Sequence, residues 1–149
     1  VRAVVPAYGV MDIYTWYQYL LDNDFDVRDP LSLRIYGDGP QDRPEAFAKR
    51  HALNFLDDLC PTTPLFVVQG ALDRIVPVDQ AHILSAALTE RGRNGDRTTV
   101  YEHAGHGFLY WDDPENRTPE ELADTERAWE DILAFLHAQL DGDPAPSSQ

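Results

Sequence analysis

The stretch LFVVQG, Leu65 to Gly70, is an almost continuous apolar run that follows Pro64 and ends at a glycine. An apolar run without alternation is typical of a strand that is covered on both faces, as in a parallel sheet. Because neither face of such a strand meets water, other elements must pack against both. This run therefore predicts an α/β fold.

Further strands and helices are predicted on both sides of this run. RAVVPAY, Arg2 to Tyr8, is rich in β-branched residues, and its first half predicts a buried strand. TTVYEH, Thr98 to His103, predicts a third strand. Apolar residues at helical spacing predict helices that begin near Asp12, Pro44, Val78 and Thr118. Strands that alternate with helices in this way form a right-handed α/β arrangement with a parallel sheet.

Two of these helices allow more detailed predictions. The helix that begins at Pro44 extends to Leu56 and breaks near Ala52. The last helix begins with a capping box, Thr118-Pro119-Glu120-Glu121, whose proline occupies the first helical position. One apolar stripe is predicted along this helix: Leu122, Trp129, Ile132, Leu133, Leu136 and Leu140. Residues 23–43 repeatedly contain Asp, Pro and Gly, which predicts a loop.

The composition disfavours several classes of function. The 149 residues carry 26 acidic and 12 basic side chains, a formal net charge of -14 that repels nucleic acid and anionic lipid. No apolar run approaches the ~18 residues that a membrane-spanning helix needs. The single cysteine, Cys60, excludes an internal disulfide and a zinc site built from cysteines, and is interpreted as a partly buried thiol before a strand.

The chain is interpreted as one domain over residues 1–140 followed by a disordered polar tail over residues 141–149, DGDPAPSSQ. It begins VRAVVPAYG, without Met and directly in a strand-like run. We therefore expect that the sequence was cut from a larger protein. The compartment is unknown for the same reason, with the cytoplasm favoured.

Asp73 and His106 are the candidate catalytic residues. Asp73 follows the strand that ends at Gly70, and His106 follows the predicted strand at residues 98–103. Because ligands of parallel sheets meet the carboxyl ends of the strands, both side chains are expected at one rim. An imidazole that takes a serine's proton and a carboxylate that orients it are the partners that a hydrolytic serine needs. Gly105 and Gly107 allow a sharp turn around the histidine, and Phe108 is placed to wall the site.

Each candidate also has a simpler interpretation. Asp73, four residues before Pro77, is in a position to cap the following helix or to close its turn, and a histidine in a glycine-rich loop is more often structural or exposed. A metal site would need His103 and His106 to join Asp112 and Asp113, although no regular ligand spacing supports it. A cluster of aromatic residues either lines a substrate pocket or packs in the core or against an absent part: Tyr14, Trp16, Tyr17 and Tyr19.

Two segments in order carry a family resemblance. The segments are PLFVVQGALDRIVPVDQA (residues 64–81) and VYEHAGHGF (residues 100–108). Together they resemble the C-terminal part of the α/β-hydrolase fold, as found in the catalytic domain of the prolyl oligopeptidase family. Dienelactone-hydrolase-like proteins and esterases are related to that family. YGDGPQDRPEAFAKRHALNFLDDL (residues 36–59) resembles the segment between the family's sixth and seventh strands. The likeness extends from about Val1 to Leu140. It implies three parallel strands, the sixth to eighth of the family, with flanking helices.

The resemblance implies that Asp73 is the acid and His106 the base of a catalytic triad, acting on a peptide or ester without a cofactor. The nucleophile of this fold lies in a G-x-S-x-G turn before the sixth strand. None of the serines of this sequence has that setting: Ser32, Ser85, Ser147 and Ser148. A basic residue that some peptidase members place two positions after the acid is also absent, because Ile75 stands there. The resemblance therefore implies a serine hydrolase fragment that is inactive alone.

Two hypotheses on function follow, with different partners. In the first, the chain is part of a serine hydrolase. Its serine comes either from the missing N-terminal half of the domain, which precedes this sequence, or from a second copy of the chain. In the second, the chain is a non-catalytic remnant that binds a partner through an exposed strand edge at residues 2–8, since a long apolar edge invites pairing. A third and weaker hypothesis is a metal-dependent hydrolase at His103 and His106.

Overall fold

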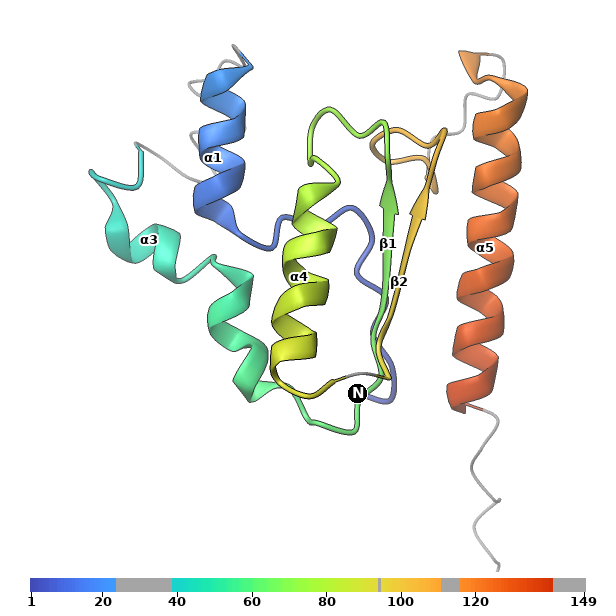
Figure 1. The fold of residues 1–149 in the computed structure, drawn as a ribbon, viewed down its shortest axis with the longest axis horizontal. Coiled ribbons are helices and arrows are strands. Elements are labelled where there is room, and N and C mark those ends of the chain that lie inside the picture. Colours follow the sequence, from blue (N-terminus) through green and yellow to red (C-terminus); the bar gives the residue numbers. More distant parts are fainter. Residues whose placement is uncertain (24–38, 94, 111–115, 141–149) are drawn as a thin grey trace, which may run out of the picture.

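The computed structural model describes residues 1–23, 39–93, 95–110 and 116–140 (Figure 1). Its sheet contains two parallel strands, β1 (Phe66–Gly70) and β2 (Arg97–Tyr101), in register from Phe66 opposite Arg97 to Gly70 opposite Tyr101. Helix α4 (Asp79–Glu90) connects them. The parallel α/β architecture predicted from the apolar run is confirmed. The predicted polar tail at residues 141–149 and most of the predicted loop lie outside the described residues.

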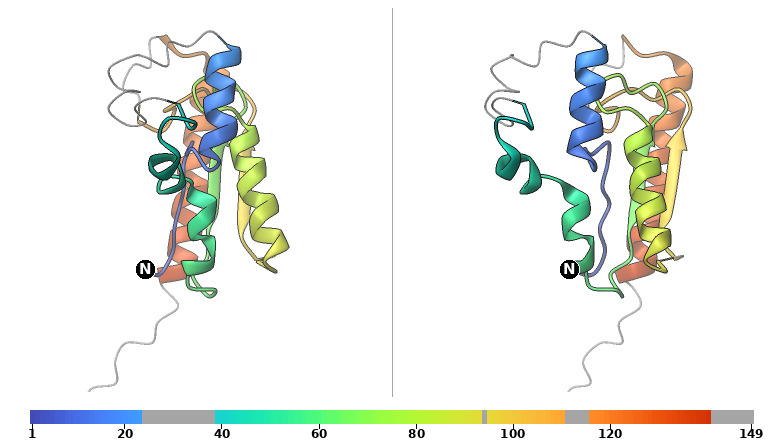
Figure 2. Two further views of the ribbon diagram at one scale, coloured as in Figure 1. Left: turned by 90° about the vertical axis from the view of Figure 1, so that its left-hand side faces the viewer. Right: turned by 60° about the vertical axis from the view of Figure 1, so that its left-hand side comes forward.

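The N-terminal segment, residues 1–8, runs parallel to β1 on the side away from β2 (Figure 2). Val4 is bridged to Leu65 and Ala7 to Val68. A continuous ladder in this register needs a hydrogen bond from the amide of residue 6 to the carbonyl of Phe66, but Pro6 has no amide hydrogen. The predicted first strand is therefore present as two isolated bridges, and the parallel order is N-terminal segment, β1, β2.

The side chains of Phe66, Val67 and Val68 alternate between two hydrophobic clusters, which explains why these successive residues of β1 are apolar. Phe66 and Val68 belong to a cluster with Tyr101 and the buried residues of α5 (Pro119–Leu140). Leu65, just before the strand, and Val67 belong to a second cluster with α4 and the short 3-10 helix η1 (Ala52–Asp58). Helices α4 and α5 accordingly cover opposite faces of the sheet (Figure 1).

The remaining helices confirm two boundary predictions. Helix α1 (Ile13–Asp22) begins directly after Asp12, whose carboxylate accepts hydrogen bonds from the backbone amides of Tyr14 and Thr15. The helix predicted from Pro44 breaks as expected, into α3 (Pro44–Ala48) and η1. None of the helices in the described ranges combines the length and the apolar character needed to span a bilayer.

The capping residue of α5 is as predicted, and its apolar stripe is confirmed in part, since Ile132 is buried and Leu136 packs against the same cluster. The Glu121 amide donates to Thr118 Oγ1. The residues that α5 buries are Asp124, Ala128 and Ile132. Trp129, Leu133 and Leu140 are exposed. The prediction was wrong for these three residues because a small side chain, Ala128, faces the sheet, and a hydrophobic pattern weights large residues more heavily.

Strand β2 is also shorter than predicted, since it ends at Tyr101 and not at His103. The His103 amide donates to Asp124 Oδ2 of α5 at 2.7 Å, so this amide is used outside the sheet. Glu102 and His103 form a turn.

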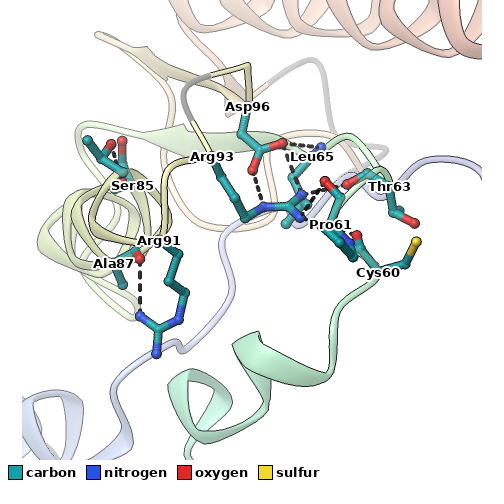
Figure 3. Close-up of polar contacts among 10 residues, drawn as sticks. Cys60, Pro61, Thr63, Leu65, Ser85, Ala87, Arg91, Arg93 and Asp96 are labelled. Atoms are coloured by element: carbon teal, nitrogen blue, oxygen red, sulfur yellow. Dashed lines mark hydrogen bonds and ion pairs between the residues drawn. The ribbon is translucent and has the colours of Figure 1, made fainter.

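A buried ion pair fixes the opposite end of the sheet, where β1 begins (Figure 3). The Arg93 guanidinium binds Asp96, and its other nitrogens donate to the carbonyls of Cys60, Pro61 and Thr63. Asp96 in turn accepts the Leu65 amide at 2.9 Å. These contacts hold the segment before β1 against the start of β2, and therefore contribute to the parallel register.

Candidate functional site

Asp73 and His106 lie together at the carboxyl ends of β1 and β2. The loop after β1 carries Asp73, and the loop after β2 carries His106. His106 Nδ1 is 2.8 Å from Asp73 Oδ2. The Asp73 side chain is fully buried, whereas 29% of the His106 side chain is exposed. The pair thus has a buried acid and an imidazole that reaches the surface.

Every oxygen of the Asp73 carboxylate has hydrogen-bond donors. Oδ1 accepts the backbone amides of Ile75 and Val76 at 2.9 and 2.8 Å. Oδ2 accepts the side-chain amide of Gln69 at 3.1 Å and faces the His106 ring. Donors on both oxygens fix the orientation of the carboxylate, so that Oδ2 faces the imidazole.

The turn at Asp73 also shows why the helix-capping interpretation is incomplete. The two amides that Oδ1 accepts belong to residues 75 and 76, before α4 begins at Asp79. Asp73 therefore closes its own turn. It makes no hydrogen bond to the first turn of α4 within the described residues, so the carboxylate is shaped by the loop and the histidine.

Gly70 allows the two loops to approach each other. A Cβ atom at this position would overlap the carbonyl oxygen of Ala104. The Leu72 amide donates to this same carbonyl at 3.0 Å, and the Ala71 amide donates to the Tyr101 carbonyl at 2.8 Å. The absence of a side chain at Gly70 is thus a condition for bringing the acid loop against the histidine loop.

The loop of His106 turns through Gly107, which has a φ of 72°, in the left-handed region that favours glycine. This agrees with the turn predicted there, but Gly105 has no positive φ. Because Nδ1 faces a carboxylate, the neutral imidazole is expected to carry its proton there, which leaves Nε2 as the proton acceptor.

Tyr8 is a residue of this rim that the sequence analysis did not identify. Its ring packs edge-on against His106 with centroids 5.3 Å apart, and against Phe108 at 5.9 Å. Its φ of 38° is unusual for a residue with a side chain, and strain of this kind clusters at functional sites. The N-terminal segment is parallel to β1, so the rule that placed Asp73 and His106 at the rim also applies to Tyr8.

The Tyr8 hydroxyl is buried and has no hydrogen-bond partner in the described part of the chain. Burial, followed by the nearby Tyr110 and Asp73, raises the pKa of Tyr8 to about 12. The phenol therefore stays protonated at neutral pH. Phe108, which was expected to wall the site, is buried in the hydrophobic core cluster and packs against the Tyr8 ring.

The four aromatic residues of α1 divide into two groups. Trp16 Nε1 donates to the Ile75 carbonyl at 2.7 Å, and the Tyr19 hydroxyl donates to the Arg74 carbonyl at 2.8 Å. Tyr14 and Tyr17 instead contact the ring of Phe47. Helix α1 thus binds the acid loop through two donors. Tyr14 and Tyr17 also line a pocket together with Gln18, Leu21 and residues 39–42, away from the Asp73–His106 pair.

The structure separates the two histidines of the metal hypothesis. His103 lies beside Asp124 of α5, with Nδ1 3.4 Å from Oδ2, while His106 faces Asp73. Asp112 and Asp113 lie outside the described residues. Among the residues with a described position, no group of three or more His, Cys, Asp or Glu side chains is arranged to hold a metal ion.

A nucleophile does not accompany the pair in the described ranges. Ser85 is in the middle of α4, where its carbonyl accepts the Thr89 hydroxyl, and it has no hydrogen bond to His106. Ser32, Ser147 and Ser148 lie outside the described residues. The arrangement can therefore orient an imidazole and let it accept a proton, but the group that loses this proton is not part of it.

Comparison with known proteins places this arrangement in context. The model of the prolyl oligopeptidase family matches residues 2–141. A puromycin-hydrolysing peptidase of Mycobacterium tuberculosis is similar in structure, with a TM-score of 0.68 and 22% identity over 96% of this chain and 19% of that one. None of the curated proteins matches.

Two acylaminoacyl peptidase structures share the fold as well. The enzyme of Pyrococcus horikoshii has a TM-score of 0.73 and 15% identity over 99% of this chain and 21% of that one. An acylaminoacyl peptidase in complex with Z-Gly-Gly-Phe-chloromethyl ketone has a TM-score of 0.71 and 18% identity, covering 97% of this chain and 21% of that one. The chain spans about a fifth of the length of each of these solved relatives.

Proposed function

Since the chain belongs to the prolyl oligopeptidase family and has its serine-hydrolase-like fold, we propose that it supplies the acid and the base of a Ser-His-Asp triad. The observation that carries this proposal is the hydrogen bond of 2.8 Å between His106 Nδ1 and the buried carboxylate of Asp73. The nucleophilic serine comes from residues outside this sequence, either from a preceding segment or from another chain. By itself, the 149-residue chain is inactive.

In this proposal His106 acts first as a base and then as an acid. Nε2 takes the proton of the serine hydroxyl as its oxygen attacks the acyl carbon, and then gives that proton to the leaving group. Asp73 keeps the ring in the tautomer with hydrogen on Nδ1 and stabilises the imidazolium between the two steps. Neither step requires a cofactor.

The substrate is an acyl compound, either a peptide or an ester. The names of the solved relatives, which are peptidases, support the first of these. The exposed side chains of Leu72 and Ile75 flank the Asp73 turn and favour apolar groups near the scissile bond. Ile75 stands where some peptidase members have a basic residue, so the choice between peptide and ester rests on assays with both substrates.

The partner in this proposal binds along the free side of the N-terminal segment. Within the described residues the backbone amides of Ala3, Val5 and Ala7 have no hydrogen-bond acceptor, while the alternate residues bond to β1. A row of unpaired amides is a template for another strand. The partner is the remaining part of the hydrolase domain or a second copy of the chain. Light scattering during size exclusion tests this, and a well-folded monomer at high concentration contradicts it.

The same free edge supports the alternative function, a non-catalytic remnant that binds a partner and has lost the chemistry. The coding sequence upstream of Val1 separates the two functions. An in-frame G-x-S-x-G motif supports the triad, whereas a start codon near Val1 without such a motif supports the remnant.

Fluorophosphonate labelling tests the assignment of the serine within the chain. The isolated chain is expected to remain unlabelled, because no serine in it has the setting of a nucleophile. Stoichiometric labelling of Ser85 or Ser32 contradicts the proposal. A Ser85→Ala variant is the control for slow, non-specific reaction on α4.

A further inference from the structure

We infer that Gln69 is a positioning residue that holds the Asp73 carboxylate in line with His106; this inference rests on the proposed function. Gln69 lies on β1, four residues before Asp73, and its exposed fraction is 1%. Its Nε2 is 3.1 Å from Asp73 Oδ2 and 2.9 Å from the Val76 carbonyl oxygen. The acid turn is thus bound at two points by one side chain.

The neighbours of the Gln69 amide determine its orientation. Asp73 Oδ2 and the Val76 carbonyl are acceptors, so the nitrogen and not the oxygen of the amide must face them. Nε2 has two hydrogens, and both of these acceptors are nearer to it than the third, the Gly70 carbonyl oxygen at 3.5 Å. The amide nitrogen therefore joins Asp73 to Val76, on the other side of the Asp73 turn. The amide cannot rotate without losing both hydrogen bonds.

A polar side chain at this place requires an explanation, since the rest of β1 is apolar or glycine. Burying an amide is unfavourable unless its hydrogen bonds are made. A methionine has nearly the same length and avoids this cost, but it offers Asp73 no donor. Without that donor, Oδ2 has only the His106 ring as a partner, and Oδ1 alone fixes the carboxylate.

The second buried glutamine of the chain shows what a purely structural role involves. Gln80 Oε1 accepts the backbone amides of Met11 and Asp12, and its Nε2 donates to Thr15 Oγ1. It joins α4 to the start of α1 and has no contact with Asp73 or His106. Gln80 is therefore a matched control, with the same chemistry and the same burial outside the site.

The test is the tautomer of His106, measured by nitrogen NMR on the 149-residue chain at a pH where the ring is neutral. Wild type is expected to show hydrogen on Nδ1 with a downfield ring proton. Gln69→Met lowers the ratio of the Nδ1 to the Nε2 tautomer several-fold and loses the downfield proton, whereas Gln80→Met retains both. A Gln69→Met chain with the wild-type ratio overturns the inference.

Two further measurements keep the test decisive. If Gln69→Met does not fold, the side-chain amide signals of Gln69 are followed in wild type while His106 is titrated. The Gln69 signals are expected to shift with the protonation of His106, whereas those of Gln80 do not. Gln69 signals that stay unchanged overturn the inference. Asp73→Asn is expected to abolish the preference for Nδ1. If it does not, the acid–base pair of the proposed function fails, and this result is distinct from a failure of Gln69 alone.

Discussion

The Nδ1 atom of His106 lies 2.8 Å from Oδ2 of Asp73, although 33 positions separate the two residues in the chain. Two parallel strands of equal length, paired in register, bring the loops that follow them to the same rim. The close approach of Gly70 to Ala104 then places the acid loop directly against the histidine loop. The geometry of the pair is therefore a consequence of how the sheet ends.

Gly70→Ala is expected to destabilise the chain and separate this pair. The added Cβ would overlap the Ala104 carbonyl oxygen, so the backbone must shift at the point where the loops meet. We expect a loss of about 2–3 kcal/mol in the free energy of unfolding, measured with urea. Gly95→Ala is the control, because a Cβ there meets open space. Equal stabilities of the two variants would contradict the proposed close approach.

Arg93→Met is expected to destabilise the fold at the opposite end of the sheet. It leaves the buried carboxylate of Asp96 and three backbone carbonyls without their donor. Breaking a buried ion pair in this way costs about 3–5 kcal/mol. The control Arg91→Met loses an ion pair with Asp57, whose side chain is 79% exposed. It also loses a hydrogen bond to the Ala87 carbonyl on its own helix (Figure 3), and the expected cost is about 0–1 kcal/mol. A smaller effect at Arg93 than at Arg91 would refute this account of the register.

The Cys60 thiol is exposed, not partly buried as predicted, and is expected to react with iodoacetamide near neutral pH. Hydrogen bonds, first from the Thr62 side chain and then from Thr63, lower its pKa from 9.0 to about 7. Only the thiolate reacts, so the rate falls about tenfold for each pH unit below this value and levels off above it. Thr62→Val should move the bend of this profile to higher pH. A wild-type rate that continues to rise beyond pH 8 would show that these hydrogen bonds do not stabilise the thiolate.

Tyr8→Phe is expected to leave the stability unchanged or to raise it by up to about 1 kcal/mol. The variant removes a buried hydroxyl that has no partner among the described residues, and it keeps the ring that packs against His106. Urea denaturation of both chains measures the difference. A loss of stability well above 1 kcal/mol would mean that the hydroxyl has a partner.

The parallel sheet and its rim could be predicted because the residues from Leu65 to Val68 are all apolar and the chain alternates strands with helices. Asp73 and His106 then followed from their places after two strands. Gln69 and Tyr8 were missed, since a single polar residue in a strand and an aromatic residue at its end have many structural explanations. Their importance depends on contacts with residues that are distant in sequence.

The errors in the prediction of the fold have similar causes. Periodicity correctly placed Ile132 and Leu136 on the side of α5 that faces the sheet, but it included the exposed Trp129 and missed Ala128. The end of β2 depends on Asp124, 21 positions beyond His103, whose amide it accepts. The division into one domain over residues 1–140 and a polar tail remains a prediction, as do the partners.

The central claim is that His106 is the base of a triad whose serine lies outside this sequence. The most direct test measures fluorophosphonate labelling of a longer polypeptide that extends upstream of Val1 to include a G-x-S-x-G motif. His106→Ala is expected to slow the labelling of that serine by on the order of a thousand-fold. His103→Ala, in the same loop but paired with Asp124, should label at the wild-type rate. Equal labelling rates of wild type and the folded His106→Ala variant would contradict the claim.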